Sequence, residues 1–183
     1  MSIIIAISGP AGSGKTTYAK KLAKELGLRY VSAGQLFRKM AREKGLSLVE
    51  FSRIAEKNYE IDKEIDKRTL EEARKGNVVL DGRLTAWVTK DIAGLKILLT
   101  APLEIRVKRI ANRDKKDYNE VFKETVEREQ SELKRYKEIY DANPYDLSLY
   151  DVVLNTSKFT IDAAVRILKK IVEEYIASHT SIG

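Results

Sequence analysis

Short apolar runs alternate along this chain with long stretches in which hydrophobic and polar residues repeat at helical spacing. The apolar runs are rich in β-branched residues, and most are hydrophobic on both alternating faces, which is typical of parallel strands covered by helices on both sides. We expect strands at 2–8, 29–33, 77–81, 95–100 and 151–156. We expect helices at 15–26, 34–44, 48–57, 61–74, 103–113, 119–140 and 161–178.

Strand–helix alternation of this kind predicts an α/β fold, a three-layer sandwich whose five-stranded parallel sheet has helices on both faces. Gly27 and Gly76 stand where helix C-caps belong, and Pro102 stands at the first position of a helix. The chain has 183 residues, no internal repeat and no linker long enough to separate domains. We therefore expect one domain over 1–183.

Composition narrows the classes of protein that fit. The chain has no cysteine, which excludes disulfides and thiolate metal sites and leads us to expect a cytoplasmic protein. Its first apolar run, Ile3 to Ile7, has no basic leader and is too short for a membrane span, so we expect neither a signal peptide nor a membrane partner.

The formal net charge of +7 allows three interpretations. One is a nucleic-acid surface, another is a lysine-rich solvated surface, and the third is an arginine pocket for phosphorylated small molecules. Acids and bases interleave at helical spacing in 20–29 and 71–76, and no segment is a purely basic tail. This pattern favours the second and third interpretations.

Residues 9–17 read GPAGSGKTT and directly follow an apolar run. They match the phosphate-binding motif G-x-x-x-x-G-K-[ST], whose glycines let the backbone curl so that N–H groups point at phosphate oxygens. The helix that follows presents its positive end to the same anion, and Lys15 can reach the β- and γ-phosphates. The candidate ATP-binding residues here are Gly9, Pro10, Ala11, Gly12, Ser13, Gly14, Lys15, Thr16 and Thr17.

Asp81 ends the apolar run of the third strand. At the carboxyl tip of a central strand its carboxylate would face the phosphate loop, where it could hold Mg²⁺ directly or through water. The alternative is an aspartate that starts a turn with Gly82. Together with the Thr16 hydroxyl, Asp81 is the predicted metal site, and Mg²⁺ is the expected cofactor.

A phosphate loop that transfers to a second nucleotide needs a second anionic site, lined by arginines and facing the first. Guanidinium groups near the γ-phosphate neutralise the charge that spreads over the transferring oxygens. Residues of this kind follow strands or share one helix face: Arg38, Arg83, the pair Arg109 and Arg113, and the set Arg128, Glu132 and Arg135. Either helical set alone would indicate an exposed salt-bridged face, but together they predict the second site.

The ordered motifs resemble those of nucleoside monophosphate kinases, most closely the cytidylate kinases of the short archaeal type. The resemblance covers nearly the whole chain: the phosphate loop, S-A-G-x-L-F-R, D-G-R, R-I-x-x-R and R-x-x-x-E-x-x-R, in that order. It implies a small helical monophosphate-binding insertion at 34–75 and a lid region at 109–135. It also implies transfer of the γ-phosphoryl group of ATP to CMP or dCMP.

The resemblance implies a role for each matching residue. Lys15, Arg109, Arg113 and Arg128 would be catalytic, with Arg109 and Arg113 in the lid over ATP. Glu132 would hold the ribose or orient Arg128, and the 155–158 backbone, with Ser157, would lie against adenine. The residues implied at the monophosphate are Ser32, Arg38, Asp81, Arg83, Arg128, Glu132 and Arg135.

The residues that read the acceptor base are less clearly marked. Leu84 stands where bacterial cytidylate kinases carry an aspartate, and the chain lacks their long insertion, so their cytosine-reading residues cannot be carried over. Asp62, Lys63 and Asp66 are candidates, with surface helix positions as the alternative. Trp87 is either a surface for the base or a core residue.

Two other functions stay open at this point. An adenylate or uridylate kinase would share every motif except base recognition, and a P-loop ATPase that binds nucleic acid would use the net positive charge. We expect ATP and a pyrimidine nucleoside monophosphate as partners, no nucleic acid, and a monomer.

Overall fold

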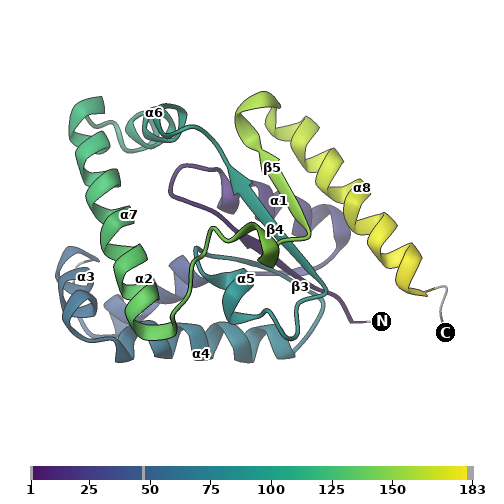
Figure 1. The fold of residues 1–183 in the computed structure, drawn as a ribbon, viewed down its shortest axis with the longest axis horizontal. Coiled ribbons are helices and arrows are strands. Elements are labelled where there is room, and N and C mark those ends of the chain that lie inside the picture. Colours follow the sequence, from purple (N-terminus) through teal and green to yellow (C-terminus); the bar gives the residue numbers. More distant parts are fainter. Residues whose placement is uncertain (1, 47, 181–183) are drawn as a thin grey trace.

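The computed structural model describes residues 2–46 and 48–180, and its centre is a parallel sheet of five strands (Figure 1). The strands are β1 (Ile4–Ser8), β2 (Arg29–Ser32), β3 (Val78–Asp81), β4 (Leu95–Thr100) and β5 (Val152–Asn155). Their order across the sheet is β2-β3-β1-β4-β5. The predicted α/β fold and its five-stranded parallel sheet are confirmed.

Every helix that the hydrophobic pattern predicts is present, with ends that agree within three residues. The helices are α1 (Lys15–Leu26), α2 (Ala33–Glu43), α3 (Leu48–Lys57), α4 (Glu60–Arg74), α6 (Leu103–Asp114), α7 (Tyr118–Tyr140) and α8 (Ile161–Thr180). Gly27 is the C-cap of α1 with φ 64°. Pro102 is the N-cap of α6 rather than its first residue, because its ψ of 146° is extended.

Three short helical elements were not predicted. They are α5 (Thr85–Val88), and the 3₁₀ helices η1 (Leu147–Leu149) and η2 (Thr156–Lys158). A single turn is too short to show helical periodicity. Local hydrogen bonds define these turns instead: the Thr89 hydroxyl donates to the Thr85 carbonyl at 2.8 Å, and the Asn155 side chain accepts from the Ser157 N–H at 3.0 Å.

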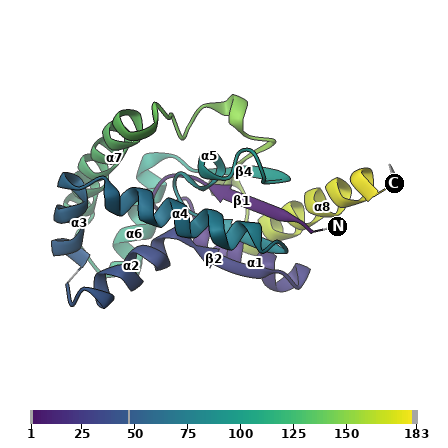
Figure 2. The ribbon, with the colours of Figure 1, turned by 90° about the horizontal axis from the view of Figure 1, so that it is seen from below.

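Helices cover both faces of the sheet, as the apolar runs predict. On one face α1 and α8 pack over β1, β3 and β4 through a core that includes Ile5, Leu22 and Leu168. On the other face α5 packs on β1 through Ala86 and Ala6, and α4 packs on β3 through Ala73. Figure 2 shows α1 and α5 on opposite sides of β1.

The edge strand β5 departs from this pattern. Its run VVLN is as apolar as the central strands, yet Val153 is 47% exposed. The other edge strand, β2, is likewise only partly buried, whereas β3 is buried throughout. An apolar run therefore predicts a strand here, but not its place in the sheet.

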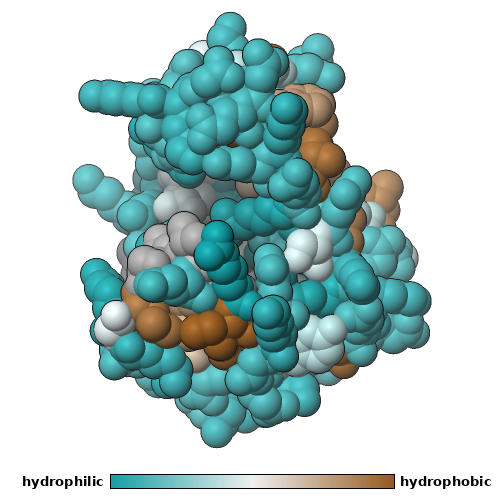
Figure 3. Space-filling model, turned by 90° about the vertical axis from the view of Figure 1, so that its left-hand side faces the viewer, coloured by the Kyte–Doolittle hydropathy of each residue, from teal (hydrophilic) through white to brown (hydrophobic). Residues whose placement is uncertain are grey.

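Two groups of helices flank the carboxyl end of the sheet (Figure 1). One group, α6 and α7, packs through Val107, Ala111 and Val121. The other, α2, α3 and α4, has its own core around Met40 and Phe51. The surface on this side is mostly hydrophilic (Figure 3), as the charged composition predicts. No helix among the described residues is long and apolar enough to cross a membrane.

Candidate active site

The loop between β1 and α1 has a backbone shape that requires glycine. Gly9 has φ 152°, and a Cβ there would lie 2.2 Å from the Leu99 carbonyl oxygen. Gly12 has φ 74°, and a Cβ there would lie 2.5 Å from the Arg106 carbonyl oxygen. The loop is thus pressed between β4 and α6. It leads into α1, whose N-terminus has no side-chain cap, so the first N–H groups of the helix are available to an anion.

Lys15 and Ser13 supply polar groups to this loop. The Lys15 ammonium donates to the Pro10 carbonyl at 2.9 Å. Burial, and then the nearby Arg83 guanidinium, lower the pKa of Lys15 to about 7. The Ser13 hydroxyl is buried and has no hydrogen-bond partner among the described residues. A site that disfavours positive charge on Lys15 and leaves a buried hydroxyl unpaired fits an anionic ligand such as a phosphate chain.

Arg106 connects the phosphate loop to the long helix α7. It is 7% exposed, and its guanidinium donates to the Ala101 carbonyl at 3.1 Å and the Ala11 carbonyl at 3.0 Å. The same group forms an ion pair with Glu129 of α7. The motifs did not point to Arg106. A signal was present, however, because Arg106 shares the apolar face of α6 with Leu103 and Ile110 at helical spacing.

Arg109 and Arg113 are one turn apart on α6 but have different surroundings. The Arg109 guanidinium donates to the Thr156 hydroxyl at 2.9 Å, the Thr156 carbonyl at 3.1 Å and the Gly12 carbonyl at 3.3 Å. The Arg113 side chain is 70% exposed and pairs with Asp114 at 2.7 Å. Arg109 therefore fixes η2 against the phosphate loop, while Arg113 stands at the surface.

The segment predicted to lie near adenine is held by Thr156. The Thr156 hydroxyl lies 2.9 Å from the Ser13 carbonyl and 3.1 Å from the Thr100 carbonyl. Ser157, the predicted ATP contact, donates its hydroxyl to Asn155 at 2.7 Å. The 155–158 turn thus borders the phosphate loop, with Thr156 as its anchor.

Arg83 and Arg128 converge on one carboxylate. Arg83, which follows β3, pairs with Glu132 of α7, and Arg128 donates to the same carboxylate at 3.1 Å. Burial, and then the charge of Arg128, lower the pKa of Arg83 to about 10. Lys15 lies within electrostatic reach of both guanidiniums. Asp81 and Glu129 also act on Lys15, and Glu129 is itself paired with Arg106, so four cations face three carboxylates in this region.

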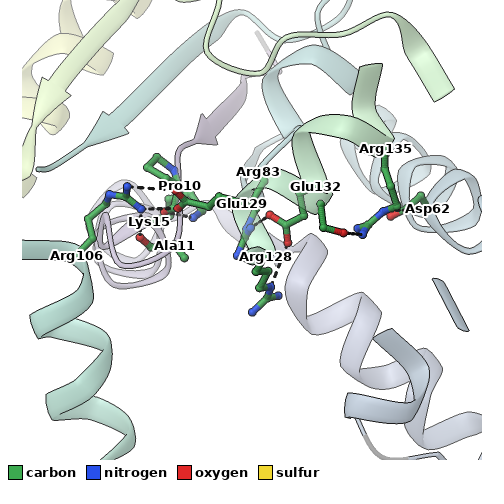
Figure 4. A network of polar contacts seen from close by, with 11 residues as sticks. Pro10, Ala11, Lys15, Asp62, Arg83, Arg106, Arg128, Glu129, Glu132 and Arg135 are labelled. Carbon is green, nitrogen blue, oxygen red and sulfur yellow. Dashed lines mark hydrogen bonds and ion pairs between the residues drawn. The ribbon is translucent and has the colours of Figure 1, made fainter. Parts of the chain in front are cut away.

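Arg135 points away from this group, toward α4. Its guanidinium donates to Asp62 at 3.2 Å and to the Ser131 hydroxyl at 3.3 Å. Figure 4 shows the resulting row of polar side chains, from Arg106 and Lys15 through Arg83 and Glu132 to Arg135 and Asp62. Arg135 therefore marks the end of this row that is distant from Lys15.

Arg38 lies beside the N-terminus of α2. Its guanidinium nitrogens are 3.8 Å from the position a Cβ would take on Gly34. A cavity of about 540 Å³ opens here, lined in part by Ser32, Gln35, Arg38 and Arg42. The charge of Arg38 also acts on Arg128, so these two arginines approach the site from opposite groups of helices.

Asp81 and Thr16 meet at the hydroxyl of Tyr30. Asp81 is 3% exposed and accepts hydrogen bonds from the Tyr30 hydroxyl and, at 3.1 Å, from the Ser32 hydroxyl. The Thr16 hydroxyl also lies within hydrogen-bonding reach of Tyr30. Burial and the neighbouring Asp81 raise the pKa of Tyr30, which therefore remains a donor. The polar role of Tyr30 was not predicted, because a tyrosine within a strand suggests only a packing role.

A carboxylate and a hydroxyl beside a phosphate loop fit Mg²⁺, which is usually held by one or two protein oxygens together with substrate phosphates. The described residues include no group of three or more His, Cys, Asp or Glu side chains that could hold a metal by themselves. Asp81 and Thr16 are therefore the residues that would hold this ion.

These features join a phosphate loop to an arginine-lined site, and comparison with known proteins gives their family. The model of the cytidylate kinase-like family matches residues 4–158, a span that includes every element described in this site. The chain belongs to the cytidylate kinase-like family. It is 51% identical to a cytidylate kinase from Staphylothermus marinus over 174 residues, which are 95% of this chain and 98% of that protein.

Other relatives agree. The chain is 50% identical to a cytidylate kinase from Methanopyrus kandleri, with 94% of each protein covered. It is 46% identical to one from Pyrococcus horikoshii, covering 93% of this chain and 88% of the relative. The resemblance to cytidylate kinases is therefore confirmed over most of the sequence.

Solved structures of low sequence identity share the fold. A shikimate kinase from Bacteroides thetaiotaomicron superposes with a TM-score of 0.65 at 15% identity, covering 94% of this chain and 99% of that chain. An uncharacterised protein from Eubacterium ventriosum gives a TM-score of 0.72 at 20% identity, with 93% and 98% covered. At such identities the likeness concerns the fold alone.

Proposed function

We propose that this protein transfers the γ-phosphoryl group of MgATP to CMP or dCMP, giving ADP and CDP or dCDP. The observation that carries the proposal is its identity of 46–51% to three archaeal cytidylate kinases over more than nine-tenths of its length. The excess of positive charge beside the phosphate loop supports it, because the phosphate groups of bound nucleotides would balance that charge.

The proposed chemistry depends on position and charge. ATP would place its β- and γ-phosphates on the loop at 9–16, against Lys15 and the N-terminus of α1. The acceptor phosphate would lie at Arg83, where it would compete with Glu132 for the guanidinium. No side chain needs to act as a base, because the acceptor phosphate is already an anionic nucleophile. Mg²⁺ would be held by Thr16 and Asp81 and would neutralise charge on the phosphates.

Closure of the site would exclude water, since an open site would hydrolyse ATP. We expect the insertion at 34–75, which contains α2, α3 and α4, to close over the monophosphate. We expect 109–135 to act as the lid, with Arg113 and Arg128 turning inward onto ATP. Both side chains have room to move, with exposures of 70% and 66%. A monomeric state, a cytoplasmic location and the lack of a nucleic-acid partner stay predictions.

An acceptor panel tests the proposal. Initial rates with MgATP and CMP, dCMP, UMP or AMP should be highest with CMP or dCMP, and Lys15→Ala should lower turnover by at least ~10²-fold, the scale for losing a transition-state donor. Lys24→Ala, an exposed lysine on the same helix, is the matched control and should leave the rates unchanged.

Preference for AMP or UMP would reject the cytidylate assignment. Substantial ATP hydrolysis without any acceptor, together with salt-sensitive RNA binding, would instead support a nucleic-acid-binding ATPase.

A further inference from the structure

Asp66 is a carboxylate near the site for which the described residues supply no cation. It is partly buried on α4 and accepts a hydrogen bond from the Tyr140 hydroxyl at 2.5 Å. None of the ion pairs found among residues 2–46 and 48–180 includes it. Asp62, one turn earlier on the same helix, has its own cation in Arg135. Burial, and to a smaller extent the charge of Asp62, raise the pKa of Asp66 to about 7.

A carboxylate that is partly buried and has no cation is unusual, because charges removed from water are normally paired. The Tyr140 hydroxyl is a single donor to one carboxylate oxygen, Oδ2. A carboxylate has lone pairs for several donors. Asp66 thus retains acceptor capacity that Tyr140 leaves unused.

One face of α7 connects Asp66 to the proposed phosphate site. Glu132, Tyr136 and Tyr140 are spaced four residues apart and so lie on that face. Glu132 pairs with Arg83 at one end, and Tyr140 binds Asp66 at the other. Tyr136 lies between them, within electrostatic reach of both Arg83 and Asp66.

The length of this face suits the acceptor. Glu132 and Tyr140 are separated by about 12 Å along the helix, at ~1.5 Å per residue. A nucleoside monophosphate with its phosphate at Arg83 would therefore bring its base to the region of Asp66.

Trp87, which is partly buried, packs against Tyr140. Its ring packs on Tyr140 with centroids 4.9 Å apart, and the Lys90 ammonium lies 4.7 Å from its centroid. With these partners, Trp87 holds the tyrosine whose hydroxyl orients Asp66. Of the two sequence-based interpretations of Trp87, the packing role accounts for these contacts.

We propose that Asp66 accepts a hydrogen bond from the exocyclic amino group of the acceptor cytosine and so selects CMP over UMP. The inference rests on the proposed function and adds its base specificity. Cytosine carries the N4 amino donor where uracil carries the O4 acceptor. Above its pKa of about 7 the Asp66 carboxylate is ionised and can only accept, so at such pH it binds the first and repels the second. Because Arg135 neutralises Asp62, Asp66 is the carboxylate that remains to accept from the cytosine amino group.

Asp66→Asn tests this assignment with little change in shape. Its amide can accept from the cytosine amino group or donate to uracil O4, so it should discriminate poorly. We expect the ratio of kcat/KM for CMP to that for UMP to fall by ~10-fold or more, within the range of one lost base contact. Glu71→Gln, an exposed carboxylate on the same helix, is the matched control and should keep the wild-type ratio.

Equilibrium binding of CMP and UMP to the same variants gives a readout independent of turnover, and should show the same loss of preference. Tyr140→Phe removes only the hydroxyl that orients Asp66 and should lower the ratio by a smaller factor. A wild-type ratio in both Asp66→Asn and Tyr140→Phe would overturn the inference, while the proposed function would stand. Failure of the wild-type protein to phosphorylate CMP would instead reject the function.

Discussion

The surroundings of Lys15 make its protonation sensitive to the binding of an anion. Its pKa of about 7, lowered first by burial and then by Arg83, means that much of its charge is absent above neutral pH. A phosphate chain on the loop would stabilise the ammonium form and raise the pKa. ATP binding should therefore be coupled to protonation of Lys15.

This coupling predicts proton uptake. Below pH 7 Lys15 already carries its proton, so uptake on binding MgATP should be small at pH 6 and approach one proton at pH 8. Calorimetry in buffers of different ionisation enthalpy measures it. Lys15→Ala should abolish the uptake and Lys24→Ala should not. Equal uptake at both pH values would show that Lys15 is not the group involved.

Functional residues that are neighbours in the sequence can be predicted from it, whereas pairs of residues that only folding brings together cannot. The residues at 9–17 could be placed on the phosphate loop because their spacing is itself the motif. The partners of Arg83 and Arg106 could not be foreseen, since each pairs with a residue of α7 brought near only by folding. Asp66 was a candidate, but its lack of a cation is visible only in the structure.

Among the elements, α6 and α7 are joined by the ion pair of Arg106 in addition to their apolar packing. This buried side chain binds the Ala11 carbonyl of the phosphate loop and Glu129 of α7 at once. Removing either partner of a buried ion pair leaves an uncompensated charge, which destabilises by ~3–5 kcal/mol. Helix α7 and the phosphate loop therefore share one support, Arg106.

A double-mutant cycle measures this support. Arg106→Met and Glu129→Gln should each lower the free energy of unfolding, and the double variant should lose less than the sum, with a coupling of ~1–3 kcal/mol. Denaturant unfolding gives the values, and Lys108→Met, an exposed neighbour on α6, is the control. Strictly additive losses would mean that Arg106 and Glu129 contribute independently.

Element boundaries were predictable where periodicity is long. The 23-residue helix α7 and the 12-residue helix α1 were expected within a residue of their ends. The one-turn helix α5 was missed because four residues carry no measurable period. Yet α5 supplies Trp87, which fixes Tyr140, so a short element that the pattern does not reveal contributes to the proposed base site.

For the molecule as a whole, the sheet sets the distance between the proposed donor and acceptor sites. In the register of the sheet Ile7 of β1 pairs with Asp81 of β3, and Ser32 of β2 pairs with the same residue. The phosphate loop, Asp81 and the N-terminus of α2 therefore leave the sheet at one level. A parallel sheet brings the carboxyl ends of its strands to one edge, and the alternation of strands and helices predicted such a sheet but not the order of its strands.

The central claim is that Arg83 binds the phosphate of the acceptor beside the phosphate loop. The most direct test is to measure kcat/KM for CMP in a variant with Arg83→Ala. The change is best made in a Glu132→Gln background, so that no buried carboxylate loses its cation. We predict a fall of at least ~10²-fold relative to Glu132→Gln alone. An unchanged kcat/KM for CMP would contradict the account.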